Sequence, residues 1–360
     1  MILREIYHKM RFEAEKYKPC RLSPEEAEQK LCAFHFHGAP EFIQANSMEC
    51  SYDLTIIIPV YNVEHYLKEC LDSVFSQKTQ YRFSVVAVDD GSTDSSGEIL
   101  EQYAFHDNLT IIHQENRGLS GARNAALKQI GAKYLLFLDS DDYLPENTVE
   151  NLLNAAFEYN ADIVQGNYRE FKGDLTVRDV ISSEQTRKIV PEEISGFACM
   201  KLIRAELLHN FCFPEGFWYE DTVMSKLLYP LCKTAVSIPE LVYCYRLHEK
   251  SISGADQSAK NIDTYWITKY CLEEAVRRGY PMDESYYRQY LQQSWVNFLR
   301  TRYLPEDIQK SIFVLTRELL NKHFQNQAAP KQRKFRMLHR AFQAGSFEAY
   351  RFLLARWELF

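Results

Sequence analysis

Five short runs of apolar residues constrain the fold of this chain more than any other feature of its sequence. The runs are LTIIIPV from Leu54, FSVVAV from Phe83, LTIIH from Leu109, YLLFL from Tyr134 and DIVQG from Asp162. Their length and composition are typical of strands, and their continuous apolarity indicates strands covered on both faces. Segments with helical apolar spacing separate them, so strand and helix alternate four times. This alternation predicts an α/β fold with a doubly wound, mostly parallel sheet flanked by helices.

The pattern changes on both sides of this region, which predicts three parts. Residues 1–52 are polar, and Ser23 followed by Pro24 is a typical helix start, so we expect a helical N-terminal extension. Residues 53–255 would form the α/β domain, in which the polar stretch after residue 170 could be a loop or a hairpin. Residues 256–360 are expected to form a helical C-terminal region.

Charge and cysteine content argue against several classes of protein. The formal net charge is -7, so nothing indicates a nucleic-acid partner. Nine cysteines occur singly, and an odd number fits poorly with a disulfide framework, so we expect reduced thiols and a cytoplasmic protein. The sequence shows neither a signal-peptide pattern nor an apolar stretch of membrane-spanning length. It also lacks the phosphate-loop and dinucleotide fingerprints of P-loop kinases and nicotinamide enzymes.

Carboxylates cluster where two of the predicted strands end. Asp89 and Asp90 follow the second run, and Asp139, Asp141 and Asp142 follow the fourth. Ligands of open parallel sheets bind at the carboxyl ends of the strands, so we expect both groups on one rim. Neighbouring carboxylates repel one another unless a cation compensates, and Mg²⁺ and Mn²⁺ prefer oxygen ligands. The alternative for a single aspartate at such a position is a helix cap or a turn.

Four segments in the same order resemble one known family. IIIPVYN, VVAVDDGSTD, NRGLSGARNAAL and YLLFLDSDDYLP are similar to the inverting glycosyltransferases of family 2. The similarity covers about residues 54–168 and continues more weakly through WYEDTVMS and YCYRLHEKSIS to about residue 254. It implies a GT-A type fold for nucleotide-diphospho-sugars. The nucleotide-binding half would span about 53–168 and the acceptor half about 169–255.

The resemblance also implies an activity. A sugar would pass from a nucleotide-diphospho-sugar, expected to be a UDP-sugar, to an acceptor hydroxyl with inversion, and Mn²⁺ or Mg²⁺ would be required. The acceptor would be a saccharide or lipid-linked saccharide of bacterial cell-envelope polysaccharide synthesis. Two other functions remain open, a phosphohydrolase that uses Asp139 or Asp141 as its nucleophile and an inactive scaffold protein that binds nucleotide-sugars.

Four residues match the family's motifs on the nucleoside side. Pro59 and Tyr61 would line the nucleoside pocket, and Asp90 would accept a hydrogen bond from the base. Asp89 would support that edge. From the residues alone, Tyr61 could equally be a core aromatic, and the aspartate pair could simply form a capped turn before the next helix.

Another five residues match positions near the diphosphate. Arg123 would lie near the pyrophosphate, because a guanidinium pairs with phosphate oxygens through fixed donors, and Arg117 is a second candidate. Asp139 to Asp142 match the family's DxD metal motif. Asp141 or Asp142 is the expected direct ligand, and Asp139 would lie nearer the sugar and ribose.

Inverting transfer also needs a base that removes a proton from the acceptor hydroxyl. The resemblance implies that Asp221 is this base, with Glu220 in reserve. Arg246 and His248 belong to a loop, continuing through 251–253, that would close over the pyrophosphate and metal. The residues alone leave open that the acidic pair simply opens a helix, and that Arg246 and His248 are surface polar groups.

The last thirty residues combine positive charge with large apolar side chains. Lys and Arg outnumber acidic residues by seven to two in residues 331–360. This composition is compatible with a helical hairpin that packs on the catalytic domain. It is also compatible with a surface that lies on an anionic membrane, which would place the protein peripherally on the inner face of the cell membrane.

Overall fold

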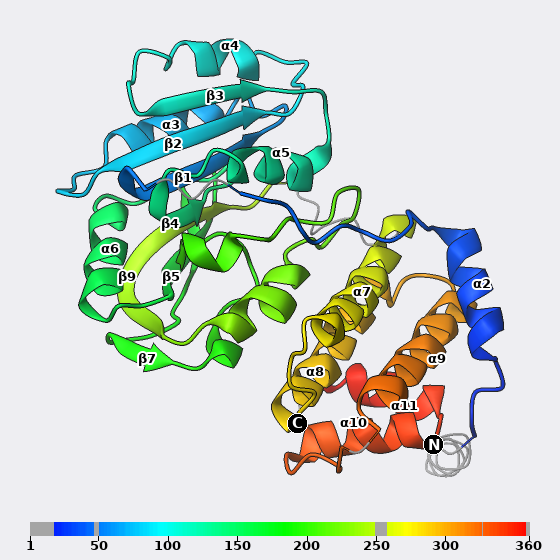
Figure 1. The fold of residues 1–360 in the computed structure, drawn as a ribbon. Helices are drawn as coiled ribbons and strands as arrows, with labels where there is room; N and C mark the ends of the chain where they lie inside the picture. Colours follow the sequence, from blue (N-terminus) through cyan, green and yellow to red (C-terminus); the bar gives the residue numbers. More distant parts are fainter. Residues whose placement is uncertain (1–17, 47–49, 249–257, 326, 358–360) are drawn as a thin grey trace. The chain divides into compact units, whose positions relative to one another are not determined.

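The computed structural model describes residues 18–46, 50–248, 258–325 and 327–357, and the chain divides into two compact units (Figure 1). Residues 39–252 form the sheet unit. Residues 1–38 and 253–360 together form the helical unit. The beginning of the predicted N-terminal extension (1–17) and the predicted loop at 251–253 lie outside the described residues.

A mixed sheet forms the centre of the sheet unit and confirms the predicted α/β fold class. Over the described residues its strands lie in the order β3-β2-β1-β4-β8-β5-β9-β7, with β6 paired to β5. The first four are mutually parallel, β8 runs antiparallel between β4 and β5, and β5 is parallel to β9. The strands are β1 (Tyr52–Val60), β2 (Phe83–Asp89), β3 (Leu109–His113), β4 (Ala132–Phe137), β5 (Ile163–Lys172), β6 (Leu175–Val180), β7 (Arg187–Ile189), β8 (Lys201–Arg204) and β9 (Ala235–Arg246).

Helices cover both faces of the parallel part of the sheet. Alternate β1 residues, beginning with Leu54, share one buried cluster with α3 (Leu67–Phe75) and α6 (Thr148–Glu158). Helix α5 (Gly118–Leu127) contacts β1 and β2 outside this cluster, as expected for the opposite face. It ends at Leu127, because the chain continues in tighter i→i+3 turns before β4.

The polar stretch after residue 170 is a hairpin, one of the two predicted alternatives. Strands β5 and β6 are antiparallel, and Gly173 adopts a left-handed φ of 57° between them. Cross-strand ion pairs join Arg169 to Asp179 and Arg178 to Glu170. The hairpin therefore extends β5 beyond its buried apolar run.

A close approach between β5 and β9 fixes the position of β9. A Cβ atom on Gly166 would lie 2.5 Å from Cγ1 of Val242 and 2.9 Å from the carbonyl oxygen of Glu240. The absence of a side chain at Gly166 therefore lets β9 pack tightly along β5. Strand β9 ends at Arg246. This residue lies beside the loop that follows β4, because Tyr143 of that loop pairs with Cys244 of β9.

Short helical segments connect the larger elements. In the sheet unit these are α4 (Ser96–Glu101), η1 (Pro191–Glu193), η2 (Ala205–Leu208), η3 (Met224–Leu228) and η4 (Tyr229–Leu231). In the helical unit η6 (Ala259–Ile262) precedes the first long helix.

The helical unit buries an aromatic core between long helices. Ser23 and Glu26 form a capping box at the start of the N-terminal helix, as the sequence predicts for a helix start, and this helix packs against α9. Phe313 of α9 stacks on Phe342 of α10 with ring centroids 5.5 Å apart. The helices are α2 (Pro24–Phe34), α7 (Asp263–Arg277), α8 (Glu284–Thr301), α9 (Glu306–His323), α10 (Arg333–Gln343) and α11 (Phe347–Leu354).

Large apolar side chains of the basic C-terminal segment are part of this core. They are no more than 7% exposed, and they are Phe335, Leu338, Phe342, Phe347, Leu353 and Trp357. Packing within the helical unit therefore accounts for these groups. Among the described residues, no helix is long and apolar enough to cross a membrane.

Candidate active site

The carboxyl ends of neighbouring parallel strands bring the predicted acidic groups to one rim of the sheet. Val60 at the end of β1 pairs in register with Asp89 at the end of β2, and β4 is the other neighbour of β1. The backbone N–H of Asp90 donates to the carbonyl of Val60 over 2.9 Å. The site is therefore built where the strands stop and their next residues turn into loops.

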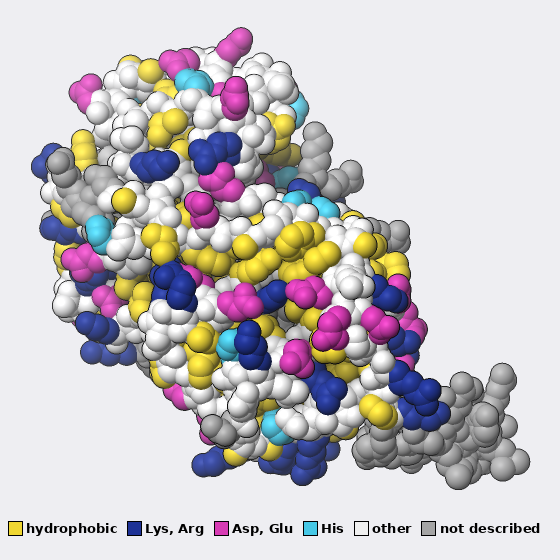
Figure 2. Space-filling view, turned by 45° about the vertical axis from the view of Figure 1, so that its right-hand side comes forward, with side chains coloured by type: hydrophobic (Ala, Val, Ile, Leu, Met, Phe, Trp, Pro, Cys, Tyr) yellow, Lys and Arg dark blue, Asp and Glu magenta, His cyan; other side chains and the backbone are white. Residues whose placement is uncertain are grey.

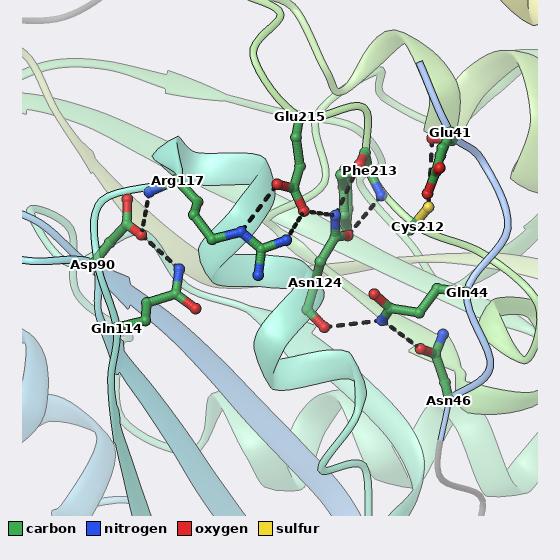
Figure 3. A network of polar contacts seen from close by, with 10 residues as sticks. All are labelled: Glu41, Gln44, Asn46, Asp90, Gln114, Arg117, Asn124, Cys212, Phe213 and Glu215. Carbon is green, nitrogen blue, oxygen red and sulfur yellow. Dashed lines mark hydrogen bonds and ion pairs between the residues drawn. The ribbon is translucent and has the colours of Figure 1, made fainter.

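Asp90 is held in a buried turn at this rim. Its side chain is 2% exposed, and its Oδ1 accepts hydrogen bonds from Gln114 Nε2 at 2.6 Å and from the backbone N–H of Arg117 at 2.9 Å (Figure 3). Gly91 follows with a left-handed φ of 73°, and a Cβ atom there would lie 3.0 Å from the backbone nitrogen of Asn116. The turn after β2 thus needs glycine and fixes the orientation of the Asp90 carboxylate.

The Asp89 carboxylate stabilises the same turn. Its Oδ1 accepts the backbone N–H of Ser92 at 3.0 Å, and its Oδ2 lies 2.9 Å from His113 Nδ1. Burial alone would raise the pKa of Asp89, but the hydrogen bonds from Ser92 and His113 outweigh it and lower the pKa. Glu101, and then Asp89, raise the pKa of His113. The Asp89 carboxylate therefore has structural partners on both oxygens.

At the end of β1, Pro59 is buried while Tyr61 is 49% exposed. Tyr61 is therefore a surface residue beside the β1 end, and the core-aromatic alternative does not hold. The predicted contact of both residues with a nucleoside stays a prediction.

A polar network ties α5 to the segment that leads toward Glu220. Arg117 makes two hydrogen bonds to the carboxylate of Glu215, at 3.1 Å from Nε and 2.6 Å from Nη2 (Figure 3). Asn124 exchanges two hydrogen bonds with the backbone of Phe213, at 2.7 and 2.9 Å. The guanidinium of Arg117 is thus engaged by a carboxylate, and its predicted role at a pyrophosphate stays a prediction.

Arg123 lies at the centre of the site and contacts three carboxylates. Its Nη2 is 3.1 Å from Asp139 Oδ1, and its Nη1 is 2.9 Å from Glu220 Oε1 and 3.0 Å from Asp221 Oδ1. The guanidinium lies over the rings of Phe137 and Phe213, which contact each other edge to face, and Arg123 is 1% exposed. One buried positive charge thus joins the DxD motif to the acidic pair, far apart in sequence.

The electrostatics around Arg123 are dominated by burial and by its excess of negative partners. Burial, followed by the charge of Asp221, raises the pKa of Glu220, although Arg123 opposes this change. Burial also raises the pKa of Asp139. For Arg123 itself burial would lower the pKa, but the charges of Asp221, Asp139 and Glu220 raise it, so the guanidinium stays charged. The predicted contact of Arg123 with a pyrophosphate stays a prediction.

The backbone is strained where the acidic pair begins. Tyr219 has a left-handed φ of 64°, a conformation that costs a residue other than glycine about 1–3 kcal/mol. Three successive turn hydrogen bonds follow, ending with Met224 N–H to the Asp221 carbonyl at 3.0 Å, and the chain then enters the π-helical turn η3. Such strain is maintained where surrounding contacts determine the conformation, and here Arg123 supplies them.

The structure gives the three DxD carboxylates different surroundings. Asp142 is 1% exposed, and it accepts Tyr243 Oη–H and the backbone N–H of Arg246, each at 2.7 Å. Burial, with the charges of Asp141 and Asp139, raises the pKa of Asp142 to about 9. Asp141 and Asp139 are partly exposed. Asp142 therefore joins β4 to β9, whereas the other two carboxylates reach solvent.

Arg246 and His248 are held against the same edge by groups that the sequence did not single out for the site. Arg246 Nε donates to the carbonyl of Asp141 at 2.7 Å, and its Nη2 lies 2.5 Å from Glu69 Oε2. Tyr66 stacks on His248 with centroids 5.5 Å apart and lies under the Arg246 guanidinium. Arg246 and His248 are thus partly enclosed rather than free surface groups.

Three residues of the site, Tyr66, Glu69 and Tyr243, were missed by sequence reasoning. Tyr66 is the N-cap of α3 and Tyr243 lies in a mostly apolar strand, so neither position by itself indicates a site. The one available signal was position, because Tyr66 and Glu69 follow closely on a strand that ends at the rim.

The carboxylates at this edge fit Mn²⁺ or Mg²⁺ as a partial ligand set. Asp139 and Asp141 present oxygen atoms, and His248 Nε2 lies 2.7 Å from Asp141 Oδ2. Within the described ranges, however, this edge does not bring three ligand atoms within 4.8 Å of one another. Such an arrangement suits ions that take few protein ligands and complete their shell with water and phosphate oxygens.

Comparisons with known proteins give the same family as the sequence motifs. The family model for glycosyl transferase family 2 matches residues 55–214. Glycosyltransferase GlyG of Streptococcus pneumoniae is 30% identical over 55% of this chain and 72% of its own length. Glycosyltransferase GlyA of the same organism is 34% identical over 68% of this chain, but the match spans only 38% of GlyA.

A solved structure gives the same fold. The crystal structure of S. aureus TarS 1–349 in complex with UDP-GlcNAc aligns with a TM-score of 0.65, covering 85% of this chain and 92% of that one at 22% identity. This likeness supports the predicted GT-A fold. The match to GlyG, together with the family model, shows that the chain belongs to glycosyl transferase family 2.

Proposed function

We propose that this glycosyltransferase moves a sugar from a nucleotide-diphospho-sugar, with a UDP-sugar as donor, to an acceptor hydroxyl with inversion. The proposal rests on the three contacts of the Arg123 guanidinium, which bring Asp221 and Glu220 beside Asp139 of the DxD motif. This places a candidate base next to the carboxylates expected at the donor sugar. The TarS structure with UDP-GlcNAc supports the choice of nucleotide.

Asp221 is the proposed base. Its side chain is 26% exposed against 12% for Glu220, so it is the more accessible of the two. As the acceptor oxygen bonds to the anomeric carbon, Asp221 takes its proton, and the bond from that carbon to the diphosphate oxygen breaks on the opposite face. Glu220, whose pKa is raised, holds Arg123 and adds negative charge beside Asp221.

The donor would lie along the rim from β2 to β4. Asp90 would accept a hydrogen bond from the base, with Pro59 and Tyr61 against the nucleoside. We propose that residues 53–168 form the nucleotide-binding half and residues 169–255 the acceptor half. The fixed turn around Asp90 supports this arrangement, because its Oδ1 is already oriented by two donors.

Mn²⁺ or Mg²⁺ would be held by Asp139 and Asp141, and it would supply positive charge that neutralises the diphosphate leaving group. Asp142 fixes the loop by binding Tyr243 and Arg246. Arg246 and His248 stand beside Asp141, where they would bind phosphate oxygens.

The acceptor we propose is a saccharide or lipid-linked saccharide of a bacterial cell-envelope polysaccharide. One further match, the Escherichia coli UDP-Glc:alpha-D-GlcNAc-diphosphoundecaprenol beta-1,3-glucosyltransferase WfgD, is 26% identical over 56% of this chain. That protein's name specifies a lipid-linked acceptor. Because the chain spans well under half of GlyA, the acceptor and setting rest on this analogy.

Peripheral membrane contact, if the acceptor is lipid-linked, would be electrostatic. The large apolar groups of α10 and α11 are buried, but Lys331, Arg333, Arg340 and Arg356 are exposed. Lys and Arg side chains are spread over the face shown in Figure 2, and several of them lie at its lower edge. Each basic residue near an anionic surface contributes about 1 kcal/mol, so the few exposed here would give reversible, salt-sensitive binding.

The first prediction concerns the metal. Release of UDP from a UDP-sugar should require Mn²⁺ or Mg²⁺ and stop in excess chelator, because the leaving diphosphate then lacks a counter-charge. Asp141→Asn should raise the metal concentration for half-maximal turnover by roughly tenfold or more. Asp174→Asn, at an exposed hairpin turn, is the control and should behave as wild type. Full turnover in chelator would contradict the metal assignment.

A second prediction separates chemistry from nucleotide binding. Asp221→Asn should lower sugar transfer by roughly a hundredfold or more with nearly unchanged UDP affinity, because only the base is lost. Asp90→Ala should instead weaken UDP binding. Calorimetry and transfer assays on both variants provide the comparison. If Asp221→Asn lost UDP affinity as severely as Asp90→Ala, Asp221 would be a binding residue and the base assignment would be wrong.

The third prediction tests membrane contact by co-sedimentation of the full chain with vesicles. Binding should be stronger to anionic than to neutral vesicles and should weaken at high salt. Replacing Arg333 and Arg340 together by Gln should reduce it. Arg302→Gln, at another exposed arginine of the helical unit, is the control. Equal, negligible binding to both vesicle types by the wild type would refute the membrane proposal.

A further inference from the structure

Two histidines and one aspartate of the helical unit form a cluster apart from the catalytic carboxylates. His35 Nε2 lies 3.6 Å from one carboxylate oxygen of Asp263, and His37 Nε2 lies 3.7 Å from the other. One ligand atom from each of the three residues falls within 4.8 Å of the others. Nothing in the proposed transfer reaction uses this cluster.

The local structure aims both histidines at the same carboxylate. His35 is the C-cap of α2 and has extended backbone angles, with φ −166° and ψ 123°. Side chains two residues apart in extended backbone project to the same side, so His35 and His37 face one way. Their rings meet edge to face with centroids 4.2 Å apart. Asp263 is the first residue of α7 and is fully buried.

Neighbouring contacts hold this arrangement in place. The backbone N–H of His35 donates to the Leu31 carbonyl at 3.0 Å, and Trp266 Nε1 donates to the carbonyl of His35 at 3.1 Å. Trp266 lies one helical turn after Asp263 and also packs against Phe36. The cluster is therefore fixed by the backbone on both sides before any ion binds.

The distances fit a shared ion better than direct hydrogen bonds. Hydrogen bonds between these groups would measure roughly 2.7–3.2 Å, shorter than the 3.6 and 3.7 Å observed. Zinc binds imidazole nitrogen and carboxylate oxygen at about 2.0–2.2 Å, and tetrahedral geometry then separates two ligand atoms by roughly 3.3–3.6 Å. The two observed distances run to different oxygens of Asp263, so an ion held by one of these oxygens would require one imidazole to shift toward it.

We propose that His35, His37 and Asp263 form a zinc-type site, with a water molecule as the fourth ligand. The ion would join the segment after α2 to the start of α7, and would thus link the N-terminal and C-terminal parts of the helical unit. Its mixed nitrogen and oxygen donors distinguish it from the all-carboxylate edge proposed for Mn²⁺ or Mg²⁺.

The test uses the untagged full chain after removal of bound metal. Excess Mg²⁺ is present throughout so that it occupies the carboxylates of the DxD edge. Calorimetric titration with Zn²⁺ should show about one equivalent bound, and Zn²⁺ should raise the temperature of thermal unfolding. His37→Gln should weaken zinc binding at least about tenfold and abolish the thermal shift. His209→Gln, at an exposed histidine of the sheet unit, is the matched control and should retain both.

A spectroscopic measurement keeps the test decisive if the variant folds poorly. Co²⁺ bound by wild type should give a four-coordinate absorption spectrum without a thiolate charge-transfer band, because the proposed ligands are two imidazoles and a carboxylate. Lack of zinc binding would mean that the histidines simply pack beside Asp263. Equal zinc binding by wild type and folded His37→Gln, or a thiolate band, would place the ion elsewhere. Any of these results would overturn the proposal.

Discussion

The active-site edge depends on one buried positive charge. Arg123 is buried against two phenylalanine rings and faces Asp139, Glu220 and Asp221 at hydrogen-bond distance. Such a group cannot lose its partners cheaply, since an uncompensated buried charge costs about 3–5 kcal/mol. The same contacts therefore stabilise the fold of the 213–221 segment and bring the proposed base to the donor edge.

A second buried interaction complements the first from the other side of the DxD motif. Asp142 joins the loop after β4 to the end of β9 through Tyr243 and the backbone of Arg246. Asp142 is turned into the protein, Asp139 is paired to Arg123, and Asp141 is paired to His248. The motif's three acids thus have different partners, a difference that their identical side chains conceal.

The sequence predicted the sheet well because continuous apolar runs have few alternatives to buried strands. It also predicted the acidic rim, since strand-end positions follow once the strands are assigned. It could not predict that Arg123 would meet carboxylates, because that depends on how the segment near Glu220 folds back onto α5. Nor could it predict that the Asp142 carboxylate turns inward to Tyr243, because nothing in the sequence distinguishes Tyr243 from other aromatic residues of buried strands. The composition of residues 331–360 was compatible with either packing or membrane contact for its apolar side chains. The structure shows that Phe335 and Trp357 are buried.

The buried charge of Arg123 is tolerated only because the three carboxylates compensate it. A double-mutant cycle on the free energy of unfolding of the sheet unit tests this claim most directly. Arg123→Met should be strongly destabilising, because three acids lose their counter-charge. Adding Glu220→Gln should recover part of the loss, with a coupling of roughly 1–3 kcal/mol between the two changes. Strictly additive effects of Arg123→Met and Glu220→Gln would contradict the account.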